Sequence, residues 1–140
     1  MKSRARPVRA AKPRRERASL ARRMRKPLFR AAACGKTVNY GALMRAFGLS
    51  RGRALSEMIG EVDERENAAG APGFAAMIVR KDTGFPGGGY FCDSSLPSAL
   101  RRPRSKASDP HLSESEKKYI RTKQNSIWKY YARVSRSARK

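Results

Sequence analysis

The chain has 140 residues and a formal net charge of +22, from 33 Lys and Arg against 11 Asp and Glu. This length is typical of one domain, and the sequence has no apolar run long enough to predict a membrane-spanning helix. The N-terminus lacks the apolar segment of a secretory signal, although its Arg-rich composition leaves a mitochondrial transit peptide as an alternative. The charge predicts a polyanionic partner, nucleic acid first and an anionic membrane surface second.

The positive charge is concentrated at the two ends of the chain. Residues 1–30 carry 13 Lys and Arg against one acid, residues 101–140 carry 13 against three, and residues 31–100 carry seven against seven. This layout predicts a neutral domain between two basic arms. We expect a basic N-terminal arm over residues 1–26, a folded domain over 27–95, a basic linker over 96–112 and a basic amphipathic helix over 113–140.

The first part of the chain predicts a polar tail followed by short helices. Residues 1–13 contain two prolines and no apolar period, which indicates disorder. Leu20 and Met24 lie four residues apart and favour a helix over residues 14–25. We expect Pro27 to interrupt that helix and to open the next one, which stops at Gly35.

Two helices with clear apolar stripes follow. The first carries Tyr40, Leu43, Met44 and Phe47 at i, i+3, i+4 and i+7, with Asn39 as its N-cap and Gly48 at its end. The second repeats this spacing with Leu55, Met58, Ile59 and Val62. Its other side carries Glu57, Glu61 and Glu64. The simplest interpretation is a solvated face, and the alternative is a docking face for the chain's own arms or for a basic partner.

A glycine-rich segment predicts a β-hairpin. FAAMIVRK (residues 74–81) has the character of a strand, DTGFPGG (82–88) that of a turn, and GYFC (89–92) that of a returning strand. Three helices followed by a hairpin are typical of the winged-helix form of helix-turn-helix. The predicted wing, with an exposed Phe85 at its tip and two cations at its root, contains Gly84, Phe85, Gly87, Gly88 and Gly89, rooted at Arg80 and Lys81.

The last segment predicts an amphipathic helix. Ser113 and Glu116 form a capping box, and an apolar stripe that includes Ile120, Ile127 and Tyr131 follows. We expect its aromatic side chains to dock on the core, although Trp128, Tyr130 and Tyr131 are alternatively able to stack on unpaired bases. The predicted fold class is mainly α with a small β-hairpin: a winged helix-turn-helix core flanked by basic disordered or helical arms.

The middle of the chain resembles the DNA-binding domain of the O6-alkylguanine-DNA alkyltransferases and the alkyltransferase-like proteins. The resemblance covers residues 37–91 and rests on VNYGALMRAFGL, SRGRALSEMIG and MIVRKDTGFPGGGY. It implies a winged helix that binds DNA from the minor groove and flips a base, with Arg51 or Arg53 as the arginine finger. The pattern is also similar to small bacterial and phage winged-helix domains of unknown role.

The family's catalytic segment is absent. Where the alkyltransferases have Pro-Cys-His-Arg, this chain has GFAAM over residues 73–77, so the nucleophilic cysteine and its activating histidine are missing. The two cysteines, Cys34 and Cys92, form neither a disulfide framework nor a metal motif, and we interpret them as small apolar residues in a reducing cytoplasm. We therefore predict no enzyme activity, no cofactor and no metal.

These patterns lead to the hypothesis of a non-enzymatic, mainly nonspecific nucleic-acid-binding protein in the cytoplasm, associated with the nucleoid, with DNA favoured over RNA. The alternatives are an RNA-binding or ribosome-associated protein, and a phage or mobile-element protein that binds a host protein. The cations expected to contact phosphates are Arg14, Arg15, Arg22, Arg23, Arg25, Lys26, Arg51, Arg53, Arg80, Lys81, Arg101, Arg102, Arg104, Lys117, Lys118 and Arg121.

Overall fold

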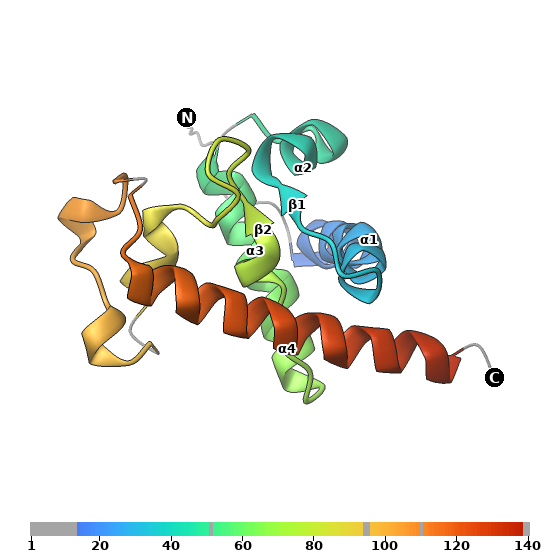
Figure 1. Ribbon diagram of the computed structural model, residues 1–140. Coiled ribbons are helices and arrows are strands. Elements are labelled where there is room, and N and C mark those ends of the chain that lie inside the picture. Colours follow the sequence, from blue (N-terminus) through green and yellow to red (C-terminus); the bar gives the residue numbers. More distant parts are fainter. Residues whose placement is uncertain (1–13, 51, 94–95, 110, 139–140) are drawn as a thin grey trace, which may run out of the picture.

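The computed structural model of the protein describes residues 14–50, 52–93, 96–109 and 111–138 (Figure 1). Within these ranges the chain is mainly helical, with a small two-stranded parallel sheet. The α-helices are α1 (Arg14–Ala33), α2 (Tyr40–Phe47), α3 (Gly52–Ala68) and α4 (Glu114–Ala138), and the strands are β1 (Val38–Asn39) and β2 (Ile78–Val79). None of these helices has the length and apolar character required to cross a bilayer.

Helix α1 runs without interruption through Pro27, so the predicted break at this proline is wrong. A proline inside a helix costs about 3 kcal/mol because it removes one backbone hydrogen bond and crowds the preceding turn. Burial of Leu20, Met24 and Leu28 on one side of α1 offsets that cost. Residues 14–26 therefore belong to the folded core and are not a separate arm, whereas the predicted disorder of residues 1–13 concerns a segment outside the described residues.

Helices α2 and α3 follow the sequence prediction closely. The side chain of Asn39 accepts a hydrogen bond from the amide of Ala42 at 2.7 Å, and Gly48 ends α2 with a φ of 65°. This left-handed conformation is one that glycine adopts without strain. In α3 the predicted stripe of Leu55, Met58, Ile59 and Val62 is buried. Local capping and periodicity are thus sufficient to define this pair of helices.

The predicted β-hairpin is not formed. Strand β2 pairs with β1 in parallel, with Val38 opposite Ile78 and Asn39 opposite Val79. The chain then makes a tight loop in which the amide of Arg80 donates to the carbonyl of Phe85 at 2.9 Å. The expected returning strand is a 3-10 helix, Gly88–Cys92. The β-branched pair in β2 is buried on a non-local partner, and the glycines of the loop offer no side chains to stabilise a ladder.

Helix α4 packs across α1 and closes the core (Figure 1). Its capping box is confirmed, because the Ser113 amide donates to Glu116 at 2.8 Å and the Glu116 amide donates to the Ser113 hydroxyl at 3.1 Å. Its buried side includes Tyr131, whose ring stacks on Phe74 with a centroid distance of 4.7 Å. The expected docking of the α4 aromatics on the core is thus confirmed for Tyr131.

The predicted linker is folded where the structure describes it. Residues 96–109 contain two short 3-10 helices, Ser98–Leu100 and Arg104–Lys106. The amide of Arg102 donates to the carbonyl of Phe91 at 2.7 Å, which ties this segment to the core. Polar, proline-containing composition predicted disorder here, but a single set of contacts centred on Arg102 orders the segment.

Candidate nucleic-acid interface

The outer side of α1 carries a stripe of basic side chains. At about 100° per helical residue, Arg15, Arg22, Arg23, Lys26 and Arg30 fall within about 100° of one another around the axis. All of them are exposed, on the side opposite the buried apolar residues of α1, and Arg14 is exposed at the start of the helix. We call these five residues the α1 stripe. The structure thus brings together several of the predicted contact residues of the N-terminal arm.

The outer side of α4 carries a second stripe. Lys118, Arg121, Lys129, Arg133 and Arg136 lie within about 120° of one another around the helix axis and extend for about 27 Å along it. These five residues, the α4 stripe, are exposed, whereas the predicted contact Lys117 is half-buried and lies 3.6 Å from Glu114. Lys129, Arg133 and Arg136 continue the stripe toward the C-terminal end of α4, beyond the predicted contact residues.

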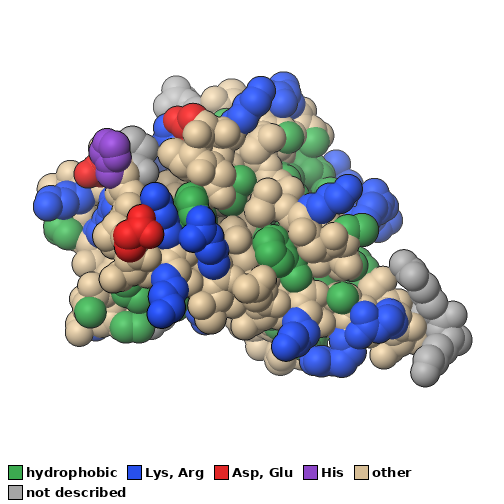
Figure 2. Space-filling model, viewed as in Figure 1, with side chains coloured by type: hydrophobic (Ala, Val, Ile, Leu, Met, Phe, Trp, Pro, Cys, Tyr) green, Lys and Arg blue, Asp and Glu red, His purple; other side chains and the backbone are tan. Residues whose placement is uncertain are grey.

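Acidic residues accompany the two stripes only at their N-terminal ends, where Glu16 adjoins Arg15 in α1 and Glu114 lies one turn before Lys118 in α4. Residues 17–56 and 117–140 contain no Asp or Glu. In the view of Figure 2, the right-hand part, over α1 and the C-terminal half of α4, shows blue side chains and no red ones, while red side chains lie in the left half. On this face of the molecule, acidic side chains are therefore absent from the part formed by α1 and the C-terminal half of α4.

A groove lies between α1 and α4. It is lined by Arg25, Lys26, Phe29, Arg30 and Ala33 of α1, by Cys34 in the turn that follows, and by Ser135 of α4, and its volume is about 420 Å³. Cys34 is exposed, contrary to the expectation that it packs as a small apolar residue. The groove joins the α1 stripe to the C-terminal end of α4 and will be called the α1–α4 groove.

A buried polar network forms the base of this region. Arg25 contacts the buried carboxylate of Glu66 through Nε at 2.5 Å and Nη2 at 3.3 Å. The Tyr131 hydroxyl lies 2.7 Å from Glu66 Oε1 and 2.6 Å from the carbonyl of Pro72. The hydrogen bond with Glu66 raises the pKa of Arg25, and burial raises the pKa of Tyr131. Arg25, predicted only as a phosphate contact, is instead a partly exposed member of an internal ion pair.

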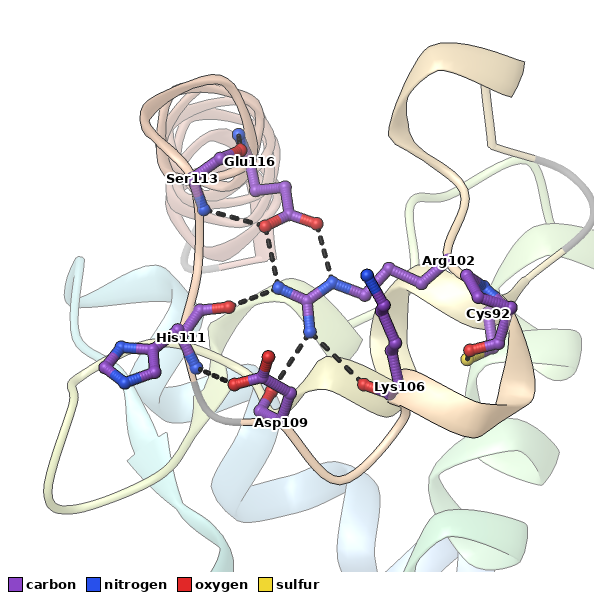
Figure 3. Close-up of polar contacts among 8 residues, drawn as sticks. Cys92, Arg102, Lys106, Asp109, His111, Ser113 and Glu116 are labelled. Carbon is purple, nitrogen blue, oxygen red and sulfur yellow. Dashed lines mark hydrogen bonds and ion pairs between the residues drawn. The ribbon is translucent and has the colours of Figure 1, made fainter.

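Arg102 is enclosed by its own neighbours (Figure 3). Its Nε and Nη2 each donate to Glu116 at 2.8 Å, Nη1 donates to the carbonyls of Lys106 at 3.3 Å and Asp109 at 3.0 Å, and Nη2 also donates to the carbonyl of His111. The side chain is only 12 % exposed. The hydrogen bonds with Glu116 raise the pKa of Arg102, and the same bonds lower the pKa of Glu116. The prediction that Arg102 contacts phosphate is therefore wrong, because all its donors are already used.

The predicted wing is folded back on the protein. Arg80 pairs with Asp82 at 2.6 Å, and Gly84 adopts a φ of 75° within the loop. Phe85, expected to be exposed at a wing tip, is half-buried, with Lys117 Nζ 5.9 Å and the guanidinium of Arg121 5.1 Å from its ring centroid. Lys81 remains exposed. Of the remaining predicted wing residues, Gly87 is the extended N-cap of the following 3-10 helix, and Gly88 and Gly89 are its first two residues.

The start of α3 presents a smaller group of cations. Arg53 is exposed and lies 3.8 Å from Glu57, and it lines an open hollow together with Arg104. Arg101 is exposed on the segment before Arg104. The predicted contact Arg51 lies outside the described residues. The structure therefore brings Arg53 and Arg104 near each other, away from the α1–α4 groove.

The rest of α3 is the negative side of the molecule. Glu57, Glu61 and Glu64, together with Asp63 and Asp93, line a groove of about 610 Å³. Burial raises the pKa of Asp63 to about 6, although its carboxylate accepts hydrogen bonds from the amides of Phe74 at 2.7 Å and Ala75 at 3.2 Å. Within the described ranges, no cluster of three or more His, Cys, Asp or Glu residues is arranged to hold a metal ion.

Glu66 is a buried acid that was not predicted, although its position in the sequence carries a signal. Glu66 continues the buried stripe of α3 four residues after Val62, so a carboxylate at that position signals a buried partner. Gln124 similarly interrupts the apolar stripe of α4, and its amide donates to the carbonyl of Ala76 at 3.0 Å. Arg102 had no comparable signal, because it stands in a segment with several similar basic residues.

Comparison with models of known protein families, with curated proteins and with solved structures found no match to this chain.

Proposed function

We propose that this protein binds nucleic acid without catalysing a reaction, mainly through phosphate contacts and with little sequence preference. The observation that carries the proposal is the pair of exposed basic stripes on α1 and α4, two helices that carry acidic residues only in their first turns. Lysine and arginine in such an arrangement neutralise phosphates and release counterions, which gives affinity that does not depend on base sequence. We favour DNA over RNA as the partner, and association with the nucleoid in the cytoplasm follows from that choice.

A helix-turn-helix role for α2 and α3 is part of this proposal. The order of α2, a short turn and α3 supports it, and the YGAL and GGGY motifs support a relationship to the winged-helix domains of alkyltransferase-like proteins. The acidic groove along α3 opposes deep insertion of this helix into DNA, because its carboxylates would approach phosphates. We therefore assign most of the affinity to α1 and α4.

A salt titration tests the proposal. The full-length protein is titrated with duplex DNA and, separately, with a structured RNA, at several salt concentrations. We expect affinity for DNA to fall steeply and linearly on a logarithmic scale as salt rises. Tighter binding to RNA than to DNA at matched salt would instead favour the second candidate function, an RNA-binding or ribosome-associated role. Absence of binding to either polymer at low salt would overturn the proposed function.

A further inference from the structure

We propose that the α1–α4 groove holds an unpaired nucleotide, so that single strands and strand ends are preferred over fully paired duplex. This inference rests on the proposed function and assigns a specific kind of partner to one part of the cationic surface. It concerns the hollow lined by Arg25, Lys26, Phe29, Arg30, Cys34 and Ser135.

The first step is the fixed orientation of Arg25. Its guanidinium is held by Glu66 through two nitrogen atoms, and Glu66 is itself held by the hydroxyl of Tyr131. The same guanidinium lies over the ring of Phe29, 5.1 Å from its centroid. The planar group is thus positioned before any ligand arrives, which lowers the entropic cost of a contact made with it.

The second step is the exposure of Arg25 toward the groove. Although Glu66 is only 7 % exposed, the Arg25 side chain is 42 % exposed, and Arg25 and Phe29 both line the groove. Guanidinium planes and aromatic rings are the surfaces on which proteins stack unpaired bases. Arg25, backed by Phe29, therefore provides a stacking platform inside a hollow.

The third step is the charge around that platform. Lys26 and Arg30 are exposed, line the groove and lie one helical turn apart on the same side of α1. Among the described residues, no carboxylate lines the groove. The two cations are therefore free of a local acidic competitor and suit the phosphates on either side of a stacked base.

The shape of the site distinguishes a single strand from a duplex. In a duplex the bases are already stacked and paired, so the groove contributes only the attraction between its cations and phosphate. An unpaired base adds stacking, which is worth about tenfold in affinity for one base. The expected result is a preference of about tenfold for a single strand over a blunt duplex of the same sequence, at matched salt.

The experiment compares binding of single-stranded DNA and a blunt duplex by the full chain and by Arg25→Lys. Lysine keeps the positive charge but lacks the planar fork. We expect Arg25→Lys to lose the single-strand preference while its duplex affinity stays within about twofold. Arg23→Lys, an exposed position of the α1 stripe outside the groove, is the matched control and should keep the preference.

A second readout does not depend on the folding of Arg25→Lys. Cys34 is exposed in the groove, and Cys92→Ser leaves it as the single thiol of the full chain. Single-stranded DNA should slow alkylation of Cys34 by about tenfold at saturation, because an occupied groove covers the thiol, and duplex should not. Equal binding of both DNA forms with no protection of Cys34 would overturn this inference and leave the proposed function standing. Failure to bind either form would overturn both.

Discussion

The hydroxyl of Tyr131 and the carboxylate of Glu66 are 2.7 Å apart, and this contact links α4 to α3 inside the core. Arg25 of α1 donates a hydrogen bond from Nε to the same carboxylate at 2.5 Å. A single acid therefore connects three helices, and its charge is neutralised within the fold. Because the partners are buried or half-buried, loss of any one leaves a polar group without its bond in a poorly hydrated place.

We expect Tyr131→Phe to destabilise the protein by about 1–2 kcal/mol, since it removes the hydroxyl shared by Glu66 and the Pro72 carbonyl while keeping the ring. Urea unfolding followed by circular dichroism measures this change. The matched control is Tyr130→Phe, because the described residues offer no hydrogen-bond partner to the Tyr130 hydroxyl. Equal effects of the two substitutions would show that the Tyr131 hydroxyl contributes nothing specific.

The stability of the fold should fall as pH rises from about 4 to about 6, because of Asp63. Its pKa is raised from 3.8 to about 6, so in this window the folded state holds a proton that the unfolded chain has released. The stabilisation by protonated Asp63 is therefore fully present below the pKa of the unfolded chain. It is lost as the pH rises through the pKa of the folded state. The shift corresponds to at most about 3 kcal/mol, reduced by solvent because Asp63 lines an open groove.

Urea unfolding at pH values across this window tests the assignment to Asp63. Asp63→Asn cannot ionise, so the dependence on pH should largely disappear, whereas Asp82→Asn on the surface should retain it. Glu116 acts with the opposite sign and at lower pH, because Arg102 lowers its pKa and protonation of Glu116 removes that stabilisation. Unchanged pH dependence in Asp63→Asn would assign the effect to another group.

Substitution of Arg102 should loosen the segment before α4. We expect Arg102→Lys to destabilise the protein by about 1–3 kcal/mol. The lysine ammonium cannot make all the hydrogen bonds that the Arg102 guanidinium donates to Glu116 and to three backbone carbonyls. Hydrogen exchange of the amides in residues 96–109 should accelerate. Arg101→Lys, at the exposed neighbouring position, should leave both measurements unchanged. Similar exchange in the two variants would contradict the role given to Arg102.

The two stripes should determine the salt dependence of nucleic-acid binding. We expect Lys129→Ala, Arg133→Ala and Arg136→Ala combined to reduce the slope of log affinity against log salt by about 2–3, at about 0.9 per lost phosphate contact. The matched control removes the same charge from exposed positions that lie off the stripes and outside the predicted contacts: Lys36→Ala, Arg45→Ala and Lys106→Ala. If that control reduces the slope equally, net charge and not the stripe carries the binding.

The sequence predicted features that depend on neighbouring residues. The caps at Asn39 and Gly48, the box of Ser113 with Glu116, and the buried stripe of α3 all rest on spacings of a few residues, and all are confirmed. These signals are strong because the capping bonds are made within the same turn of chain.

Several features that depend on distant residues were predicted incorrectly, although the docking of Tyr131 on the core was predicted correctly. Pro27 indicated a helix break, but burial of α1 against α3 and α4 outweighs this local preference. Strand β2 pairs with a strand 40 residues away in the sequence instead of forming a hairpin. The charges at the two ends of the chain were recognised, but composition does not reveal that α1 and α4 pack together, nor that Arg25 and Arg102 are used internally.

Acidic side chains line a groove along α3, whereas α1 and α4 each carry a stripe of five exposed cations, and this uneven distribution of charge gives the molecule a permanent electric dipole. In the field of a polyanion such a dipole experiences a torque, so the molecule rotates during approach until its positive side leads. Approach in the reverse orientation is less favourable, because the carboxylates of α3 then face the phosphates. The arrangement of a few carboxylates on α3 therefore contributes to the rate and direction of docking, although those groups make no part of either basic stripe.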